Sequence, residues 1–189
     1  MDNYIERIAE IDKKLEKKSL FLFGPRQTGK SSYIKKQLAE PRLSWTLLDN
    51  ELYRDLSMRP SLLRNTLRAK GINDGVVVLD EIQRLPDLLN EVHMLIEETD
   101  IHFLLTGSSA RKLKKKGVNL LGGRAGRLNF HSLVWPEIKD FDPSLEHIFR
   151  SGLLPAAFSG DDFESLLSDY VGLYVKEEIE AEREVRNLP

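Results

Sequence analysis

The 189-residue chain contains no cysteine, which excludes disulfides, thiolate zinc sites and thiol nucleophiles. It also has little net charge, −2 at pH 7, and therefore no general attraction to nucleic acid or anionic membranes. Hydrophobic runs are short, and none approaches the roughly 18–20 residues that a membrane helix needs. The amino-terminal stretch is charged and amphipathic, unlike a secretory signal. These absences predict a cytoplasmic protein.

Hydrophobic residues make up 41% of the chain, enough for a buried core. Short apolar runs alternate with segments of helical pattern, which is typical of βαβ units and a parallel sheet. The expected strands cover residues 19–23, 44–48, 75–79, 101–105 and 128–130, the last either ending there or continuing to 133. Residues 86–98 are predicted to form a helix with one apolar stripe. After Trp135 the pattern is helical, over residues 136–139, 144–150 and 161–186. We therefore expect an α/β core over residues 1–134, and a helical extension or the start of a second domain over 135–189.

Residues 24–31 read GPRQTGKS, a full match to the phosphate-binding pattern G-x-x-x-x-G-K-[ST]. Gly24 and Gly29 permit backbone angles that other residues avoid, so successive N–H groups can converge on phosphate oxygens. The helix that begins near Lys30 points its positive end at the same anion. Lys30 is expected to reach the β- and γ-phosphates, and the Ser31 hydroxyl to bind Mg²⁺. The expected nucleotide contacts are Gly24, Pro25, Arg26, Gln27, Thr28, Gly29, Lys30, Ser31 and Ser32.

Two further apolar runs end in polar side chains. The run VVVLDE, residues 76–81, places Asp80 to hold Mg²⁺ and Glu81 to act as general base for the attacking water. The alternative is an acidic pair that caps the following helix. The run LLTGSS, residues 104–109, offers Ser108, or as second choice Thr106, as a sensor of the γ-phosphate. The alternative for Ser108 is a helix cap.

Three basic features have more than one interpretation each. In the stretch LGGRAGRL, residues 121–128, Arg124, or as second choice Arg127, reaches a γ-phosphate in its own site or in a neighbouring subunit, or is a surface residue. The run RKLKKK, residues 111–116, is either a solvated face or a nucleic-acid contact, although aromatic residues that could stack on bases are missing nearby. Arg26 either touches phosphate or lies on the surface, and we favour the surface.

Four blocks, GPRQTGKSS, VVVLDEIQRLPDLL, LLTGSSARKL and LLGGRAGRL, stand in this order along the chain. Together they resemble a prokaryotic family of AAA+ superfamily ATPases related to the archaeal and STAND-like P-loop ATPases. The resemblance implies a P-loop NTPase fold, with a five-stranded parallel sheet in the order 5-1-4-3-2 flanked by helices. It implies a Walker A pair at Lys30 and Ser31, a Walker B pair at Asp80 and Glu81, a sensor at Ser108 and an arginine at Arg124. It also implies a C-terminal domain of unknown function, which we expect to be missing from a chain that stops at Pro189.

These patterns lead us to expect Mg²⁺-dependent binding and hydrolysis of ATP, coupled to conformational change in a client or partner domain. The alternative is a nucleotide-dependent switch or interaction module with negligible hydrolysis. A small-molecule kinase fits less well, because it has no need of an acidic pair poised for water. The expected partners are nucleotide, a second copy of the chain, and a nucleic acid or protein client reached through the missing domain, with no membrane.

Overall fold

The structure is a computed structural model that describes residues 4–38, 40–109, 113 and 121–175. The chain divides into two compact units. The sheet unit comprises Ala9–Pro25 and Lys30–Phe130, and the helical unit comprises the described residues within Met1–Ile8, Arg26–Gly29 and His131–Pro189. The glycine-rich loop, residues 24–31, thus begins and ends in the sheet unit, while its four middle residues group with the helical unit.

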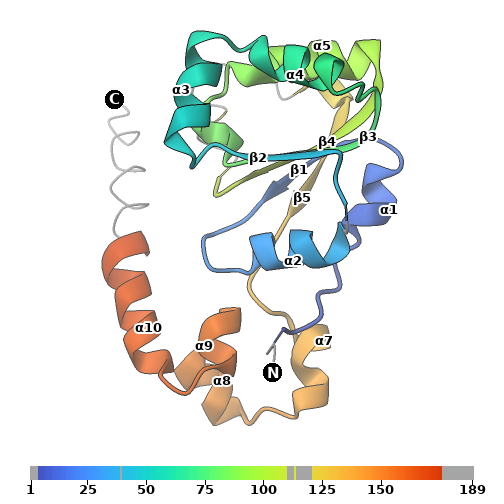
Figure 1. Ribbon diagram of the computed structural model, residues 1–189. Coiled ribbons are helices and arrows are strands. Elements are labelled where there is room, and N and C mark those ends of the chain that lie inside the picture. Colours follow the sequence, from blue (N-terminus) through green and yellow to red (C-terminus); the bar gives the residue numbers. More distant parts are fainter. Residues whose placement is uncertain (1–3, 39, 110–112, 114–120, 176–189) are drawn as a thin grey trace, which may run out of the picture. The chain divides into compact units, whose positions relative to one another are not determined.

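The sheet unit is built on five parallel strands. They are β1 (Ser19–Phe23), β2 (Leu43–Thr46), β3 (Asp74–Asp80), β4 (Asp100–Gly107) and β5 (Ala125–Asn129). Their order is β2-β3-β4-β1-β5, which is the predicted order 5-1-4-3-2 counted from the opposite edge (Figure 1). The predicted sheet is therefore confirmed.

The fifth strand begins earlier than predicted. It covers Ala125–Asn129 rather than starting at Leu128, and Leu20 of β1 lies opposite Gly126. Partly buried and exposed residues mix along β5, as expected for a strand at the edge of the sheet. The sequence pattern did not reveal this beginning because Gly126 and Arg127 resemble a turn, whereas their backbone is paired with β1.

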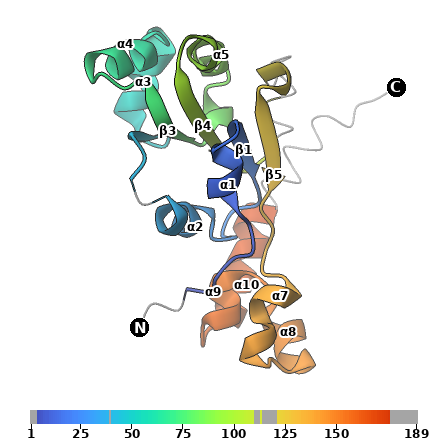
Figure 2. The ribbon, with the colours of Figure 1, turned by 90° about the vertical axis from the view of Figure 1, so that its right-hand side faces the viewer.

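Helices cover both faces of the sheet (Figures 1 and 2). One face carries α3 (Asn50–Met58), α4 (Leu62–Ala69) and α5 (Leu88–Glu98), and the other carries α1 (Ile11–Leu15) and α2 (Lys30–Gln37). Asp49 caps α3, since its carboxylate accepts from the N–H groups of Glu51 and Leu52. The stripe predicted on α5 is confirmed, and its buried members are Leu88, Leu89, Val92 and Leu95.

Successive residues of β1 pack into two separate cores because strand side chains alternate between the faces. Phe21 and Phe23 belong to the core beneath α3, α4 and α5. Leu20 and Leu22 belong to the core shared with α1 and α2, where Tyr33 is fully buried. A strand buried on both faces reads as a continuous apolar run, which is why β1 was predictable from sequence.

The helical unit contains α7 (Trp135–Ile138), α8 (Leu145–Ser151), α9 (Pro155–Ser159) and α10 (Phe163–Asp169), followed by a π-helical segment, Tyr170–Val175. Its core gathers Ile5, Leu133, Ile138 and Phe158. The helices predicted at 136–139 and 144–150 are confirmed to within one residue. The helix predicted over 161–186 is described as far as Val175, and the rest lies outside the described residues.

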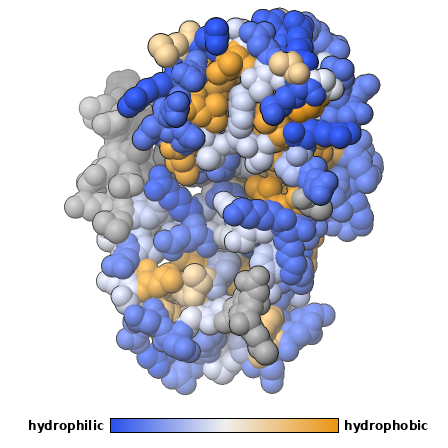
Figure 3. Space-filling view, viewed as in Figure 1, coloured by the Kyte–Doolittle hydropathy of each residue, from blue (hydrophilic) through white to orange (hydrophobic). Residues whose placement is uncertain are grey.

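The surface drawn in Figure 3 is largely hydrophilic, with hydrophobic residues in smaller separate areas. Exposed large apolar side chains of the helical unit include Trp135, Phe141, Leu145 and Phe149. Among the helices of the described residues, none has the length and apolar character needed to cross a bilayer.

Candidate nucleotide-binding site

The carboxyl ends of four strands meet at one edge of the sheet. The register sets Thr46 beside Asp80 and Phe23 beside Gly107. In open parallel sheets, ligands bind beyond this edge, between two neighbouring strands whose onward connections run in opposite directions. Those strands are β1, whose connection leads toward β2, and β4, whose connection leads toward β5. The glycine-rich loop follows β1 directly, so it begins at the expected ligand-binding position.

Gly24 leaves β1 through a narrow space. Its N–H donates to the Gly107 carbonyl at 3.2 Å, and the neighbouring Phe130 N–H donates to the Phe23 carbonyl at 2.6 Å. A Cβ on Gly24 would lie 2.0 Å from the Phe130 carbonyl oxygen. We predicted that a backbone angle unfavourable for other residues requires glycine at this position, but the φ of Gly24 is not positive. Close approach of the backbone is what requires glycine here.

The middle of the loop contains two residues in the left-handed region, Gln27 with φ 61° and Gly29 with φ 85°. Alternation of left-handed with ordinary residues turns successive N–H groups to one side and forms an anion-binding concavity. A non-glycine residue in this region is uncommon, and such residues cluster at ligand-binding sites. The loop therefore alternates left-handed and ordinary residues, as anion-binding concavities do.

Lys30 begins α2 and reaches back across the loop. Its Nζ donates to the carbonyl oxygens of Gly24 and Pro25, each at 2.6 Å. Ser31 and Ser32 follow on the exposed first turn of α2. The ammonium group thus lies over the beginning of the loop, within the segment proposed to hold phosphate.

The other loop side chains differ in exposure. Pro25, Arg26 and Gln27 are exposed, whereas Thr28 is fully buried. The Arg26 guanidinium lies 5.6 Å from the centre of the Tyr174 ring, a cation–π contact within the helical unit. Arg26 is thus on the surface in this structure, on an aromatic ring.

Asp80, at the end of β3, is held by hydroxyl groups from both neighbouring strands. Its Oδ1 accepts a hydrogen bond from Thr106 Oγ1, and its Oδ2 accepts one from Thr46 Oγ1 at 3.2 Å. Thr106 is fully buried. It therefore orients Asp80, a different role from the sensor considered as a second choice. Carboxylate and hydroxyl oxygens are the donors that Mg²⁺ prefers, so Asp80 and Ser31 fit that ion chemically.

Glu81 follows with a left-handed backbone, φ 59°, and is linked to Ser108 through a residue that the sequence did not reveal. Gln83 Nε2 donates to Glu81 Oε2 and lies 3.4 Å from Ser108 Oγ. A Cβ on Gly107 would lie 2.1 Å from Gln83 Oε1, so this glycine leaves room for the amide. Gln83 thus joins the predicted base to the predicted sensor. The alternative for Ser108, a cap of a following helix, concerns residues 110–120, of which only Leu113 is described, and stays a prediction.

Arg124 lies away from these groups. It immediately precedes Ala125, which pairs with Ser19 at the start of β1, whereas the loop follows Phe23 at the end of β1. Its Nε forms an ion pair with Glu97, and this guanidinium lowers the pKa of Glu97 through a hydrogen bond and its charge. Arg124 thus lies at the amino edge of the sheet, away from the loop, and contact with a γ-phosphate in its own site or in a neighbouring subunit stays a prediction.

Arg127, the second choice, contacts residues at the carboxyl ends of β5 and β1. Arg127 Nε donates to Asn129 Oδ1 at 3.0 Å, and its guanidinium lies 5.9 Å from the centre of the Phe23 ring. The basic run at 111–116 lies outside the described residues except for Leu113, which is fully buried. Nucleic-acid contact by this run stays a prediction.

This strand order, with a phosphate-binding loop after β1 and a carboxylate at the end of β3, defines an α/β P-loop nucleotide-binding protein. The sequence pattern of a family described as AAA domain matches residues 16–139. The chain belongs to this AAA domain family, whose P-loop ATPase character assigns it nucleotide binding.

Comparison with curated proteins finds no match. Among solved structures, the chain is similar to the Orc1 protein of Aeropyrum pernix, determined in complex with DNA, with 18% sequence identity and a TM-score of 0.49. The similarity covers 72% of this chain and 48% of that chain, so this chain spans about half the length of Orc1.

Proposed function

We propose that this protein binds ATP with Mg²⁺ at the glycine-rich loop and hydrolyses the β–γ phosphoanhydride bond. The observation that carries the proposal is the arrangement at one sheet edge, where Lys30 lies over the loop, Asp80 ends β3 and Glu81 follows it. Residues 1–134 would form the ATPase core, and 135–189 a helical extension or the start of a second domain.

Binding would depend on the backbone of the loop and on Lys30. The carbonyl oxygens of Gly24 and Pro25 now accept from the Lys30 ammonium, and phosphate oxygens are stronger, charged acceptors for the same group. Nucleotide contacts would extend from Gly24 to Ser32. Ser31 and Asp80 would hold Mg²⁺, which supplies positive charge to the phosphate oxygens. The two threonines beside Asp80 fix the direction of its carboxylate before any ligand arrives.

Hydrolysis needs a base for water. Glu81 would take a proton from the water while the water oxygen attacks the γ-phosphorus. The bond from that phosphorus to the β–γ bridging oxygen breaks, which releases ADP and inorganic phosphate. Ser108 would contact the γ-phosphate, and Gln83 would keep Glu81 and Ser108 at a fixed separation. Positioning and charge stabilisation account for most of phosphoryl-transfer catalysis, and these residues supply both.

The proposal includes a partner on which ATP turnover acts. ATP turnover would drive conformational change in a partner domain, a second copy of the chain, or a nucleic acid or protein client. Arg124, at the amino edge, would be available only to the site of a neighbouring copy. The cytoplasmic location expected from the composition stays a prediction.

The test is to measure ATP affinity and steady-state phosphate release for the wild type, Lys30→Ala, Asp80→Asn and Glu81→Gln. Lys30→Ala should lose affinity, and Asp80→Asn should raise the Mg²⁺ concentration required. Glu81→Gln should keep affinity and lose turnover by about a hundredfold or more, the range of general-base catalysis.

The matched control is Glu97→Gln, which removes an exposed carboxylate at the amino edge and should change neither quantity. Saturable ATP binding without measurable wild-type turnover would favour the nucleotide switch instead. Absence of saturable ATP binding would contradict the proposed function as a whole.

A further inference from the structure

A deeply buried ion pair in the described part of the helical unit joins Arg7 and Glu137, to which no role has been given above. The side chain of Arg7 is 5% exposed and that of Glu137 is 3% exposed, with 3.0 Å between Arg7 Nε and Glu137 Oε1. Charges are buried at a high cost unless other groups pair with them. We therefore expect other groups to hold this buried pair, which joins a residue near the amino terminus to one in α7.

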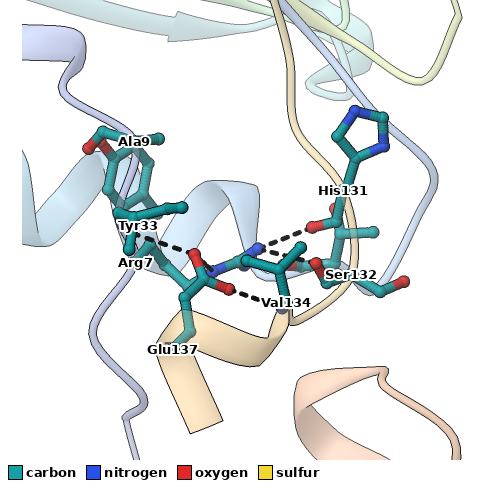
Figure 4. A network of polar contacts seen from close by, with 9 residues as sticks. Arg7, Ala9, Tyr33, His131, Ser132, Val134 and Glu137 are labelled. Carbon is teal, nitrogen blue, oxygen red and sulfur yellow. Dashed lines mark hydrogen bonds and ion pairs between the residues drawn. The ribbon is translucent and has the colours of Figure 1, made fainter. Parts of the chain in front are cut away.

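The guanidinium group of Arg7 binds backbone carbonyl groups of two distant segments. Nη1 donates to the Thr28 carbonyl at 2.7 Å. Nη2 donates to the carbonyls of His131 at 2.7 Å and Ser132 at 3.2 Å, which Figure 4 shows beside the ion pair. Arg7 thus ties the middle of the glycine-rich loop to the segment that leads into α7.

Glu137 is itself fixed, so it can hold Arg7 in one orientation. Its Oε1 accepts from the Ile8 N–H and its Oε2 from the Val134 N–H, both at 3.0 Å. Val134 immediately precedes α7, so one carboxylate oxygen caps that helix while the other faces Arg7 (Figure 4). A carboxylate held at both oxygens leaves the guanidinium plane little freedom.

The contact at Thr28 determines the direction of the next N–H group. In a planar trans peptide, the carbonyl of one residue and the N–H of the following residue point in opposite directions. Because Arg7 holds the Thr28 carbonyl, the Gly29 N–H of the same peptide points away from the guanidinium. A Cβ on Gly29 would lie only 3.8 Å from Arg7 Nη1, so the guanidinium packs closely on this peptide.

We propose that Arg7 is a positioning residue for the glycine-rich loop: it fixes the Thr28–Gly29 peptide in the orientation that phosphate binding requires, and Glu137 holds it there. The inference rests on nucleotide binding at the loop and does not depend on hydrolysis. It predicts that Arg7→Lys weakens nucleotide binding, because a single ammonium group cannot reach a carboxylate and several carbonyls together as the planar guanidinium does.

The test compares Arg7→Lys with the wild type by thermal unfolding and by titration with ATP in the presence of Mg²⁺, far below the unfolding temperature. We expect a folded variant whose dissociation constant for ATP rises by about tenfold or more, equivalent to about 1.4 kcal/mol. The matched control is Arg150→Lys, which alters an exposed arginine paired with Glu164 in the same unit and should leave the dissociation constant unchanged.

A second variant keeps the test decisive if Arg7→Lys does not fold. The double variant Arg7→Gln with Glu137→Gln leaves no unpaired buried charge and also removes the guanidinium fork. It should fold and lose ATP affinity in the same way. A variant that unfolds at a lower temperature but binds ATP as the wild type does would show a purely structural ion pair and would overturn the inference. Failure of the wild type to bind ATP would overturn the proposed function instead.

Discussion

The side-chain amide of Gln83 donates a hydrogen bond to the carboxylate of Glu81, two residues earlier in the chain. The contact is possible because Glu81 adopts a left-handed backbone, φ 59°, and a short 3₁₀ turn, Ile82–Arg84, follows it. The turn brings the amide back over the carboxylate, while the same nitrogen lies 3.4 Å from Ser108 Oγ. The position of the proposed base is therefore set by local backbone geometry.

Removing this amide should slow hydrolysis and leave nucleotide binding intact. Gln83→Met keeps a similar length but cannot donate to Glu81, so the carboxylate loses its fixed direction. We expect phosphate release to fall by roughly tenfold, a fraction of a general base's full contribution, with ATP affinity little changed. Gln37→Met, at the end of α2, serves as control. Unchanged turnover in Gln83→Met would show that Glu81 is positioned by other groups.

A methyl group at Gly107 should produce the same effect indirectly. The added Cβ would lie 2.1 Å from Gln83 Oε1, so the amide would have to move away. Gly107→Ala should lower turnover as Gln83→Met does, and the double variant should be no worse than either alone, because both changes remove one interaction. Gly172→Ala has open space around the new methyl and should be neutral. Additive losses in the double variant would mean that the two positions act separately.

The hydroxyl groups beside Asp80 should govern how much Mg²⁺ the reaction needs. Thr106→Val removes a buried donor to the carboxylate, and a lost hydrogen bond to a charged group is worth about 1–3 kcal/mol. The Mg²⁺ concentration for half-maximal turnover should rise by about tenfold or more. Thr46→Val removes a longer and exposed contact, 3.2 Å, and should have a smaller effect. Equal effects would contradict this ranking of the two threonines.

Arg124 should be dispensable for nucleotide binding by a single chain. It lies at the amino edge of the sheet and pairs with the exposed Glu97. Arg124→Ala should therefore leave ATP affinity unchanged and shift the denaturation midpoint very little, since exposed pairs are weak. Titration calorimetry and denaturant unfolding measure the two quantities. A large loss of ATP affinity in this variant would contradict this prediction and would show that Arg124 contacts the nucleotide bound to a neighbouring copy.

Sequence predicted those parts of the fold and site that depend on local pattern. The doubly buried strands β1 and β3 appear as uninterrupted apolar runs, and the glycine-rich loop has a fixed spacing. Asp80 was found because it ends such a run, and parallel register then places it beside Thr46. The start of β5 was missed because backbone pairing, rather than side-chain burial, makes that stretch a strand.

Contacts between residues distant in the chain could not be found in this way. Arg7 and Glu137 are separated by most of the chain, and each alone resembles an ordinary surface charge in an amphipathic helix. Gln83 escaped notice because its role depends on the left-handed backbone of Glu81, for which the sequence carries no signal. The role assigned to Gly24 was also incomplete, since the space beside it is closed by the backbone of Phe130, which follows β5 and is distant in the sequence.

The division of β1 between two cores limits how this protein can vary in evolution. Phe21 and Phe23 face one side, and Leu20 and Leu22 the other. Insertion or deletion of a single residue would exchange the two sets, so only changes of two residues preserve the packing. Two residues, however, would move the glycine-rich loop by about 6.6 Å along the strand and away from Gly107 and Asp80. Related sequences should therefore vary in the length of their connections while β1 keeps the same number of residues.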